Sequence, residues 1–177
     1  NPIGAPHDTS ITGVKRPFLI SGPCSAESEQ QVLDTARALQ HTGIHLFRAG
    51  VWKPRTRPNA FEGIGEPALQ WLTAARRETG IPVATEVANT QHVEACLNAG
   101  IDVLWIGART TVSPFAVQEI ATALQGTNVP VFVKNPMHAD LPLWMGAIER
   151  VRKATDAPVW AIPVSYTHLR AHETATY

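Results

Sequence analysis

The sequence has little of what marks secreted, membrane-bound or nucleic-acid-binding proteins. Lysine plus arginine and aspartate plus glutamate both number 15, so no net charge attracts nucleic acid or an acidic membrane. No apolar run approaches the roughly 18 residues that a membrane-spanning helix needs. Residues 1–16 lack the basic-then-apolar pattern of a signal segment. We therefore expect a cytoplasmic protein with neither nucleic-acid nor membrane partners.

Cysteine is scarce as well. The two cysteines, Cys24 and Cys96, lie in unlike contexts, so we expect free thiols and no structural disulfide. Cys96 falls on the apolar face of a predicted helix and is assigned to the core. Cys24 follows Gly22-Pro23 at the end of a predicted strand, where its thiol suits a nucleophile, a metal ligand or a small core residue.

What the sequence does have is a regular alternation of short β-branched runs with longer stretches of helical period. Ser28 with Gln31 predicts a capping box for the first helix, and Ser113-Pro114 opens the fourth. The predicted strands are 18–20, 45–49, 83–86, 103–106, 131–134 and 159–162. The predicted helices are 29–41, 67–79, 91–98, 114–124 and 143–154.

Strict strand–helix alternation predicts an α/β fold of parallel strands with right-handed crossovers. Both an open doubly wound sheet and a (β/α)8 TIM barrel fit. Chemistry-bearing residues follow several different strands, which favours the barrel. A whole barrel needs eight units and ~250 residues, so we expect one truncated to about five and a half βα units. The expected division is an irregular lead-in (1–16), a partial barrel (17–162) and a non-native tail (163–177).

A cationic loop follows the second predicted strand. Within residues 48–57 it holds four cations and no acid: Arg48, Lys53, Arg55 and Arg57. A solvated loop would normally intersperse acids to reduce repulsion. Guanidinium groups on a backbone stiffened by proline suit phosphate and carboxylate oxygens, so we predict that this loop binds anions.

Further charged residues follow the other strands. Glu86 ends the third strand, Arg109 follows the fourth and Lys134 ends the fifth. In a barrel these positions share one mouth with the cationic loop. Six cations and one acid at one mouth predict a small ligand with several negative charges.

Several aromatic and histidine residues are assigned no role in the chemistry. Trp52, inside the cationic loop, is the one tryptophan that is a candidate for the floor of the pocket. His138 is read as a solvated loop residue. The residues assigned to packing are Trp71, Trp105, Trp144 and Trp160, and those of the tail given no metal role are His168, His172 and Glu173.

Four motifs, Gly-Pro-Cys-Ser, Lys-Pro-Arg-Thr, Ile-Gly-Ala-Arg-Thr and Val-Lys-Asn-Pro, occur in that order at strand ends. Together they resemble the short, metal-dependent 3-deoxy-7-phosphoheptulonate (DAHP) synthases over residues 17–162. The resemblance implies a TIM barrel with a divalent metal (manganese, iron, zinc or cobalt). It also implies condensation of phosphoenolpyruvate with erythrose 4-phosphate, which begins the shikimate pathway to the aromatic amino acids. The parent protein would be a homo-oligomer, in some members fused to chorismate mutase.

The resemblance also implies roles for individual residues. Cys24 corresponds to a metal-ligating thiolate. Glu86 corresponds to a catalytic acid that helps to hold the attacking water, and Lys134 to a catalytic and substrate-binding lysine. The residues that correspond to the phosphoenolpyruvate site are Arg48, Lys53, Ala108, Arg109 and Lys134. Those that correspond to the erythrose 4-phosphate loop are Lys53, Pro54, Arg55 and Thr56.

Two alternatives remain open. The related octulosonate 8-phosphate synthases read Lys-Ala-Asn-Arg where this chain has Lys-Pro-Arg-Thr from Lys53, which favours the seven-carbon product. The other alternative is a non-catalytic partial barrel that binds phosphorylated metabolites. After Ile162 the family pattern continues with a metal-binding His-Arg-Gly, whereas this chain reads Pro163-Val164-Ser165 and then resembles a translated sequencing-adapter artefact. We therefore expect the chain itself to be inactive.

Overall fold

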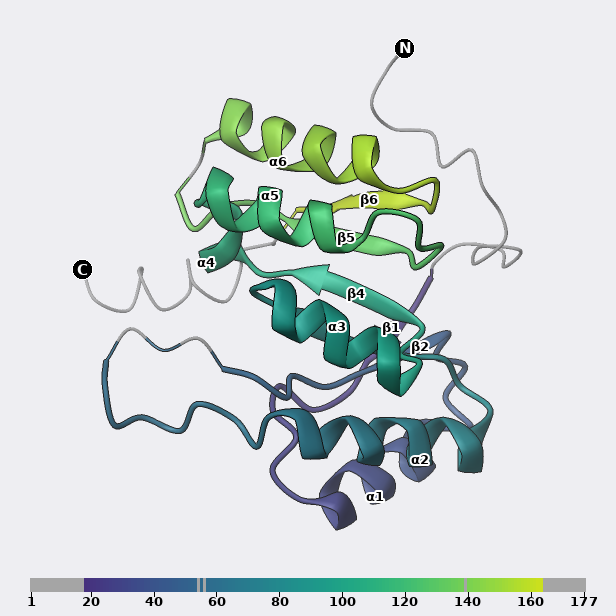
Figure 1. The fold of residues 1–177 in the computed structure, drawn as a ribbon. Helices are drawn as coiled ribbons and strands as arrows, with labels where there is room; N and C mark the ends of the chain where they lie inside the picture. The colour runs from purple at the N-terminus through teal and green to yellow at the C-terminus, as the bar shows by residue number, and fades with distance from the viewer. Residues whose placement is uncertain (1–17, 54, 56, 139, 164–177) are drawn as a thin grey trace, which may run out of the picture.

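The computed structural model describes residues 18–53, 55, 57–138 and 140–163. Within them, strands and helices alternate along the chain (Figure 1). The strands are β1 (Ile20–Ser21), β2 (Leu46–Arg48), β3 (Val83–Val87), β4 (Val103–Ile106), β5 (Val131–Lys134) and β6 (Val159–Ile162). The helices are α1 (Glu29–Leu39), η1 (Glu66–Ala68), α2 (Leu69–Thr79), α3 (Thr90–Ala99), α4 (Ala108–Thr111), α5 (Pro114–Ala123) and α6 (Leu141–Ala154).

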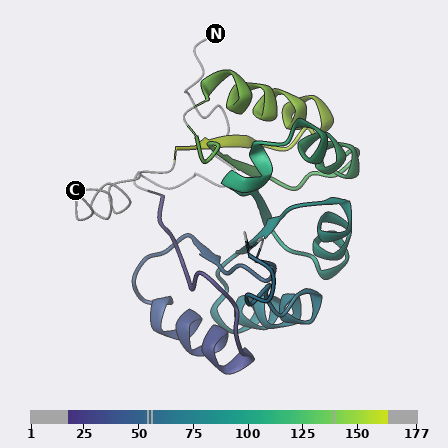
Figure 2. The ribbon, with the colours of Figure 1, turned by 90° about the vertical axis from the view of Figure 1, so that its left-hand side faces the viewer.

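The six strands form one parallel sheet in the order β1-β2-β3-β4-β5-β6. A doubly wound sheet reverses its strand order at a switch point and carries helices on both faces. Here the order never reverses, and the helices lie along one convex side of a curled sheet (Figure 2). The fold is therefore a partial TIM barrel, which confirms the predicted fold class.

Alternating strand residues divide the apolar core into two layers. The larger layer lies between the sheet and the helices and includes Phe47, Leu104, Ile106 and the sulfur of Cys96. Burial raises the pKa of the Cys96 thiol to about 12, as fits its predicted place in the core. The smaller layer lines the concave face and contains Leu46, Ala84, Val103, Trp105 and Phe132.

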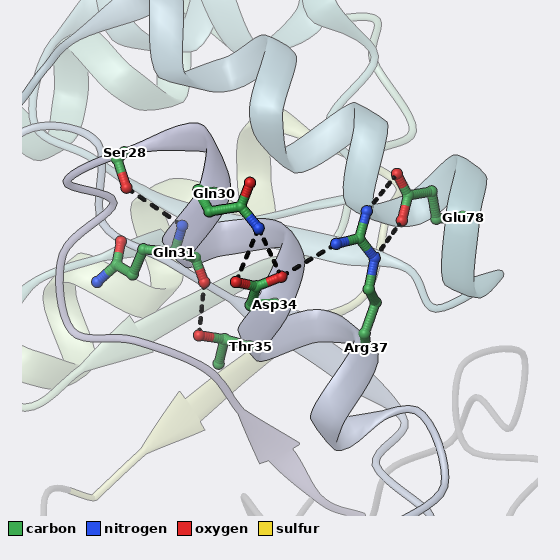
Figure 3. A network of polar contacts seen from close by, with 7 residues as sticks. All are labelled: Ser28, Gln30, Gln31, Asp34, Thr35, Arg37 and Glu78. Atoms are coloured by element: carbon green, nitrogen blue, oxygen red, sulfur yellow. Dashed lines mark hydrogen bonds and ion pairs between the residues drawn. The ribbon is translucent and has the colours of Figure 1, made fainter.

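Helix α1 shows how a local signal fixes an element (Figure 3). The Ser28 hydroxyl accepts a hydrogen bond from the Gln31 amide at 3.2 Å, as predicted. The reciprocal bond differs from a standard capping box, because the Gln31 side chain accepts from the Glu27 amide at 2.9 Å. On the outer surface the Arg37 guanidinium pairs with Glu78 of α2 at 2.8 Å, which ties the first two helices together.

Several observed elements differ from the prediction by one or two residues at their ends, and three of the differences have a local explanation. Strand β1 begins at Ile20 rather than 18, because the Leu19 amide donates to Nδ1 of His45 instead of joining a strand ladder. Helix α6 begins at Leu141, two residues early, because Asp140 caps it by accepting from the Leu143 amide at 2.9 Å. Helix α4 was not predicted, since four residues are too short to show a helical period.

The predicted lead-in (1–16) lies outside the described residues, as does nearly all of the predicted tail (163–177). Within the described ranges no helix has both the length and the hydropathy to cross a bilayer.

Gly22 allows the ends of β1 and β2 to approach each other. Its φ is +150°, and a Cβ at this position would overlap the carbonyl oxygen of Arg48. Only glycine tolerates both conditions at once. The first residue of the Gly-Pro-Cys-Ser motif therefore has a steric explanation.

We predict that Gly22→Ala lowers the free energy of unfolding by about 3 kcal/mol, because it adds backbone strain to a steric overlap. The matched control is Gly43→Ala, where φ is +78° and a Cβ would meet nothing within 4 Å. That change should cost about 1 kcal/mol. Urea unfolding measures both, and equal losses would contradict the close-approach explanation.

Candidate active site at the carboxyl ends of the strands

Four side chains that could bind or act on a ligand lie on the concave face, near the carboxyl ends of the strands. Arg48 ends β2, Glu86 lies in β3, Trp105 in β4 and Lys134 ends β5. Each is an even number of residues from a member of the concave layer in its own strand, and side chains alternate between faces. Parallel pairing places Glu86 directly beside Trp105.

Trp105 forms the floor of this cluster. The guanidinium carbon of Arg48 lies 4.6 Å from a Trp105 ring centroid, and Nζ of Lys134 lies 5.3 Å from it. Both distances are within the range of cation–π attraction. The Trp105 indole N–H also donates to Oε2 of Glu86 at 3.1 Å. Trp105 packs in the core as predicted, within the concave layer, but its three polar contacts were not predicted.

Gly107 leaves room for the Glu86 carboxylate. A Cβ at Gly107 would overlap the Glu86 carboxylate oxygen, although the backbone of Gly107, with φ −74°, suits any residue. The glycine of the Ile-Gly-Ala-Arg-Thr motif is thus explained by its neighbour on β3. Glu86 is held between this opening and the Trp105 indole.

Cys24 and Lys53 meet beside the cluster. Nζ of Lys53 lies 3.2 Å from the Cys24 sulfur and also donates to the Cys24 carbonyl. Partial burial raises the pKa of the Cys24 thiol, but the Lys53 and Arg48 cations outweigh this effect and bring it below its ordinary value. Cys24 therefore ionises more readily than an ordinary thiol.

The end of β5 is fixed by neighbouring side chains. The Thr111 hydroxyl donates to the Lys134 carbonyl at 2.9 Å, and the Trp144 indole donates to the Val133 carbonyl at 3.0 Å. Thr111 is fully buried in α4, so this short helix serves as a brace for the strand end. The Lys134 side chain therefore extends from a backbone that two neighbouring side chains hold in place.

The cluster carries excess positive charge. No carboxylate among the described residues lies within ion-pair distance of Arg48, Lys53 or Lys134. Burial lowers the pKa of Lys134; the Glu86 charge opposes this effect, and the Arg48 charge adds to it. An anion bound here would gain from three cations that have no full counter-charge.

The remaining predicted site residues are not drawn into this cluster. The Nε of Arg55 donates to the Phe61 carbonyl at 2.8 Å, and Arg109 is exposed on α4 beside Ala108. Pro54 and Thr56 lie outside the described residues, as do His168, His172 and Glu173. His138 is exposed, in agreement with its assignment as a loop residue.

The described residues provide only part of a metal site. Cys24 is exposed and inclined to ionise, so its sulfur fits as one ligand of a divalent ion. No group of three histidine, cysteine, aspartate or glutamate side chains placed to hold a metal occurs within the described part of the chain. Those residues alone therefore do not make a metal centre.

The sequence of the chain matches a known family. The sequence profile of the DAHP synthetase I family matches residues 2–177. The chain belongs to this family. It is 36% identical over 91 residues to the phospho-2-dehydro-3-deoxyheptonate aldolase of Thermotoga maritima, covering 51% of this chain and 27% of that protein.

Relatives that are named for a different product match as well. The 2-dehydro-3-deoxyphosphooctonate aldolase of Dechloromonas aromatica is 33% identical over 125 residues, covering 66% of this chain and 45% of that protein. The corresponding protein of Cupriavidus necator is 36% identical over 100 residues, covering 52% and 34% respectively.

Solved structures agree with the fold. The crystal structure of the Thermotoga maritima aldolase (DAHP synthase) superposes with a TM-score of 0.69 and 26% identity, over 81% of this chain and 40% of that chain. A truncated form of 3-deoxy-D-arabino-heptulosonate 7-phosphate synthase from the same organism, at 22% identity and TM-score 0.66, supports the fold alone. The chain thus spans less than half the length of these relatives.

We predict that Gly107→Ala displaces the Glu86 carboxylate without unfolding the protein, because the overlapping atoms end a flexible side chain. The Glu86 charge raises the pKa of Lys134, so moving it away should lower that pKa further. Lys134 would then lose its proton at a lower pH than in the parent. NMR titration of the Lys134 side chain measures this shift.

The control is Gly146→Ala in α6, where a Cβ would meet nothing within 4 Å and Lys134 should titrate as in the parent. Both variants should unfold within about 1 kcal/mol of the parent. An unchanged Lys134 titration in Gly107→Ala would contradict the proposed link between Gly107, Glu86 and Lys134.

Proposed function

We propose that the chain carries the phosphoenolpyruvate-binding part of a DAHP synthase, which joins phosphoenolpyruvate to erythrose 4-phosphate and releases phosphate. The observation that carries this proposal is the gathering of Arg48, Lys53 and Lys134 without an ion-paired carboxylate at the concave edge. Phosphoenolpyruvate bears a carboxylate and a phosphate, so it matches such a site in charge. Family membership supports the same conclusion.

The arrangement suggests a division of tasks. Arg48 and Lys134 share the Trp105 ring, which positions two cations to bind the carboxylate and phosphate of one ligand. Lys53 and Arg109 complete the phosphoenolpyruvate contacts in this proposal. Positive charge so placed would also stabilise phosphate as it departs.

Glu86 is suited to hold a water molecule. Its Oε2 accepts from Trp105, and its Oε1 lies in the opening at Gly107; in this proposal Oε1 accepts from a water near the bound phosphoenolpyruvate. In the proposed reaction, C3 of phosphoenolpyruvate forms a bond to the aldehyde carbon, and the aldehyde oxygen takes up a proton. The water oxygen adds to C2, and phosphate leaves together with the oxygen that joined it to C2.

The proposal also includes a divalent metal ion, whose role is considered apart from the reaction steps above. Cys24 would supply one of its ligands, and the ion would act as a Lewis acid toward the aldehyde. No reaction step is assigned to it, because the described residues give it one thiolate. We propose in addition that the parent protein is a homo-oligomer.

A second candidate has a specific observation in its favour. Two of the relatives described above are 2-dehydro-3-deoxyphosphooctonate aldolases. An eight-carbon product that takes three carbons from phosphoenolpyruvate needs a five-carbon sugar phosphate as acceptor. The Lys-Pro-Arg-Thr sequence from Lys53 favours the four-carbon acceptor instead.

We predict that Arg55→Ala weakens the binding of erythrose 4-phosphate about ten- to hundredfold, because one charge-assisted contact contributes about 1.5–3 kcal/mol. Phosphoenolpyruvate binding should change little. Arg109→Ala should show the opposite pattern, so two exposed arginines control for each other. Calorimetry with each ligand measures both effects, and equal losses for both ligands would contradict the separate roles.

We also predict that the 177-residue chain binds phosphoenolpyruvate but turns over no substrate, since the described residues hold one metal-binding thiolate. The measurement is phosphate release with phosphoenolpyruvate, manganese and a four- or five-carbon sugar phosphate. A DAHP synthase with known turnover serves as the positive control. Turnover above background with either acceptor would refute the predicted inactivity and would identify the substrate.

A further inference from the structure

Trp52 and His92 form a stacked pair that joins the cationic loop to α3. Their ring centroids lie 3.9 Å apart with an interplanar angle of 9°. Trp52 belongs to the segment after β2, whereas His92 lies in the first turn of α3, after β3. Both side chains are half-buried. The proposed reaction makes no use of His92, so the contact needs another explanation.

The His92 ring is held in place by groups in the turn between β3 and α3. Nδ1 accepts a hydrogen bond from the Ala88 amide at 3.2 Å, and the His92 amide donates to the Asn89 side chain at 2.9 Å. A nitrogen that accepts carries no proton, so the stacked imidazole is neutral. Burial lowers the pKa of His92, which favours the same form. The imidazole is therefore fixed to the β3–α3 turn and offers Trp52 a rigid, flat surface.

Trp52 lies where residues 51–53, in the cationic loop, meet residues 62–65. The Lys53 amide donates to the Glu62 carbonyl at 2.7 Å, and the Gly65 amide donates to the Val51 carbonyl at 2.9 Å. These two bonds join residues 51–53 to residues 62–65, and we call this junction around Trp52 the neck of the loop. Gly65 also lies against the indole, because a Cβ there would come within 3.6 Å of its nitrogen.

Lys53 follows Trp52 directly in the chain, so the indole fixes the backbone from which Lys53 reaches Cys24. A tilt of the indole would swing the start of the Lys53 side chain. Because that side chain is long, its ammonium group would move away from the cluster. The contacts thus run from the stack through the Lys53 backbone to the anion site.

We propose that His92 is a positioning residue for the anion site: its imidazole holds Trp52, and Trp52 holds Lys53 and the neck of the cationic loop. The inference rests on the proposed function for the identity of the anion. It deepens that function by adding a residue that touches neither substrate.

The test compares three changes at His92. His92→Phe keeps a flat ring and loses the Nδ1 acceptor, His92→Asn keeps a short acceptor and loses the ring, and His92→Ala loses both. Phosphoenolpyruvate affinity, measured by calorimetry, should fall about three- to tenfold in the Asn and Ala variants, as expected for loss of an aromatic pair. The Phe variant should stay within about twofold of the parent.

A second readout needs no ligand. Prolines follow Lys53 and Arg57, so Arg55–Thr56 is the only bond in residues 53–58 that trypsin cuts. Cleavage there under native conditions should speed up about three- to tenfold in the Asn and Ala variants and in Trp52→Leu. Combining Trp52→Leu with His92→Ala should add nothing to either single change. His41→Ala, an exposed histidine after α1, is the control and should match the parent.

The proposal is supported if the Asn and Ala variants lose affinity and are cleaved faster, while the Phe variant behaves like the parent. If the Phe variant is as impaired as the Ala variant, the Ala88 hydrogen bond is responsible, and the proposal is overturned. Unchanged cleavage in every variant also overturns it. If the parent binds no phosphoenolpyruvate, the proposed function fails, while cleavage at Arg55 still decides the role of the stack. Should His92→Ala not fold, the comparison of Phe, Asn and Trp52→Leu decides.

Discussion

Repulsion among Arg48, Lys53 and Lys134 is the constraint around which the concave edge is built. Three cations close together destabilise a folded chain unless their charge is compensated. The Trp105 ring attracts Arg48 and Lys134, and main-chain carbonyls accept from Arg48 and Lys53. Glu86 lowers the local charge without pairing directly with any of the three. What remains is a positive site whose repulsion an anionic ligand would relieve.

The fold supplies the close approaches that this site needs. Gly22 lets the loop after β1 approach the end of β2, so that Cys24 reaches Lys53, and Gly107 gives space to Glu86. Thr111 in α4 braces the end of β5. The family motifs therefore have two roles: their charged side chains form the site, and their glycines leave the space that these side chains occupy. The Trp52–His92 stack extends the same principle to the neck of the cationic loop.

The sequence predicted the strands and long helices well, because their period and caps are short-range signals, as the Ser28 cap illustrates. Asp140 was overlooked, although an acid two residues before Pro142 is a usable cap signal. The contacts of Trp105 depend on which strand residues face inward and on pairing between β3 and β4. The predicted barrel makes β3 and β4 neighbours, but a single sequence does not give the register that sets Glu86 beside Trp105. Arg109 and Arg55 were placed at the mouth by their positions after the fourth and second strands. Their individual roles were implied by the resemblance and stay predictions.

We propose that the concave edge around Trp105 binds phosphoenolpyruvate. Titration of the ¹⁵N-labelled chain, followed by the five tryptophan indole N–H resonances, tests it directly. We predict that the Trp105 resonance moves most, because its ring lies beneath Arg48 and Lys134 and its N–H bonds to Glu86. Trp71, packed in the outer layer, should not move. A titration that leaves Trp105 unchanged while phosphoenolpyruvate binds would contradict the account.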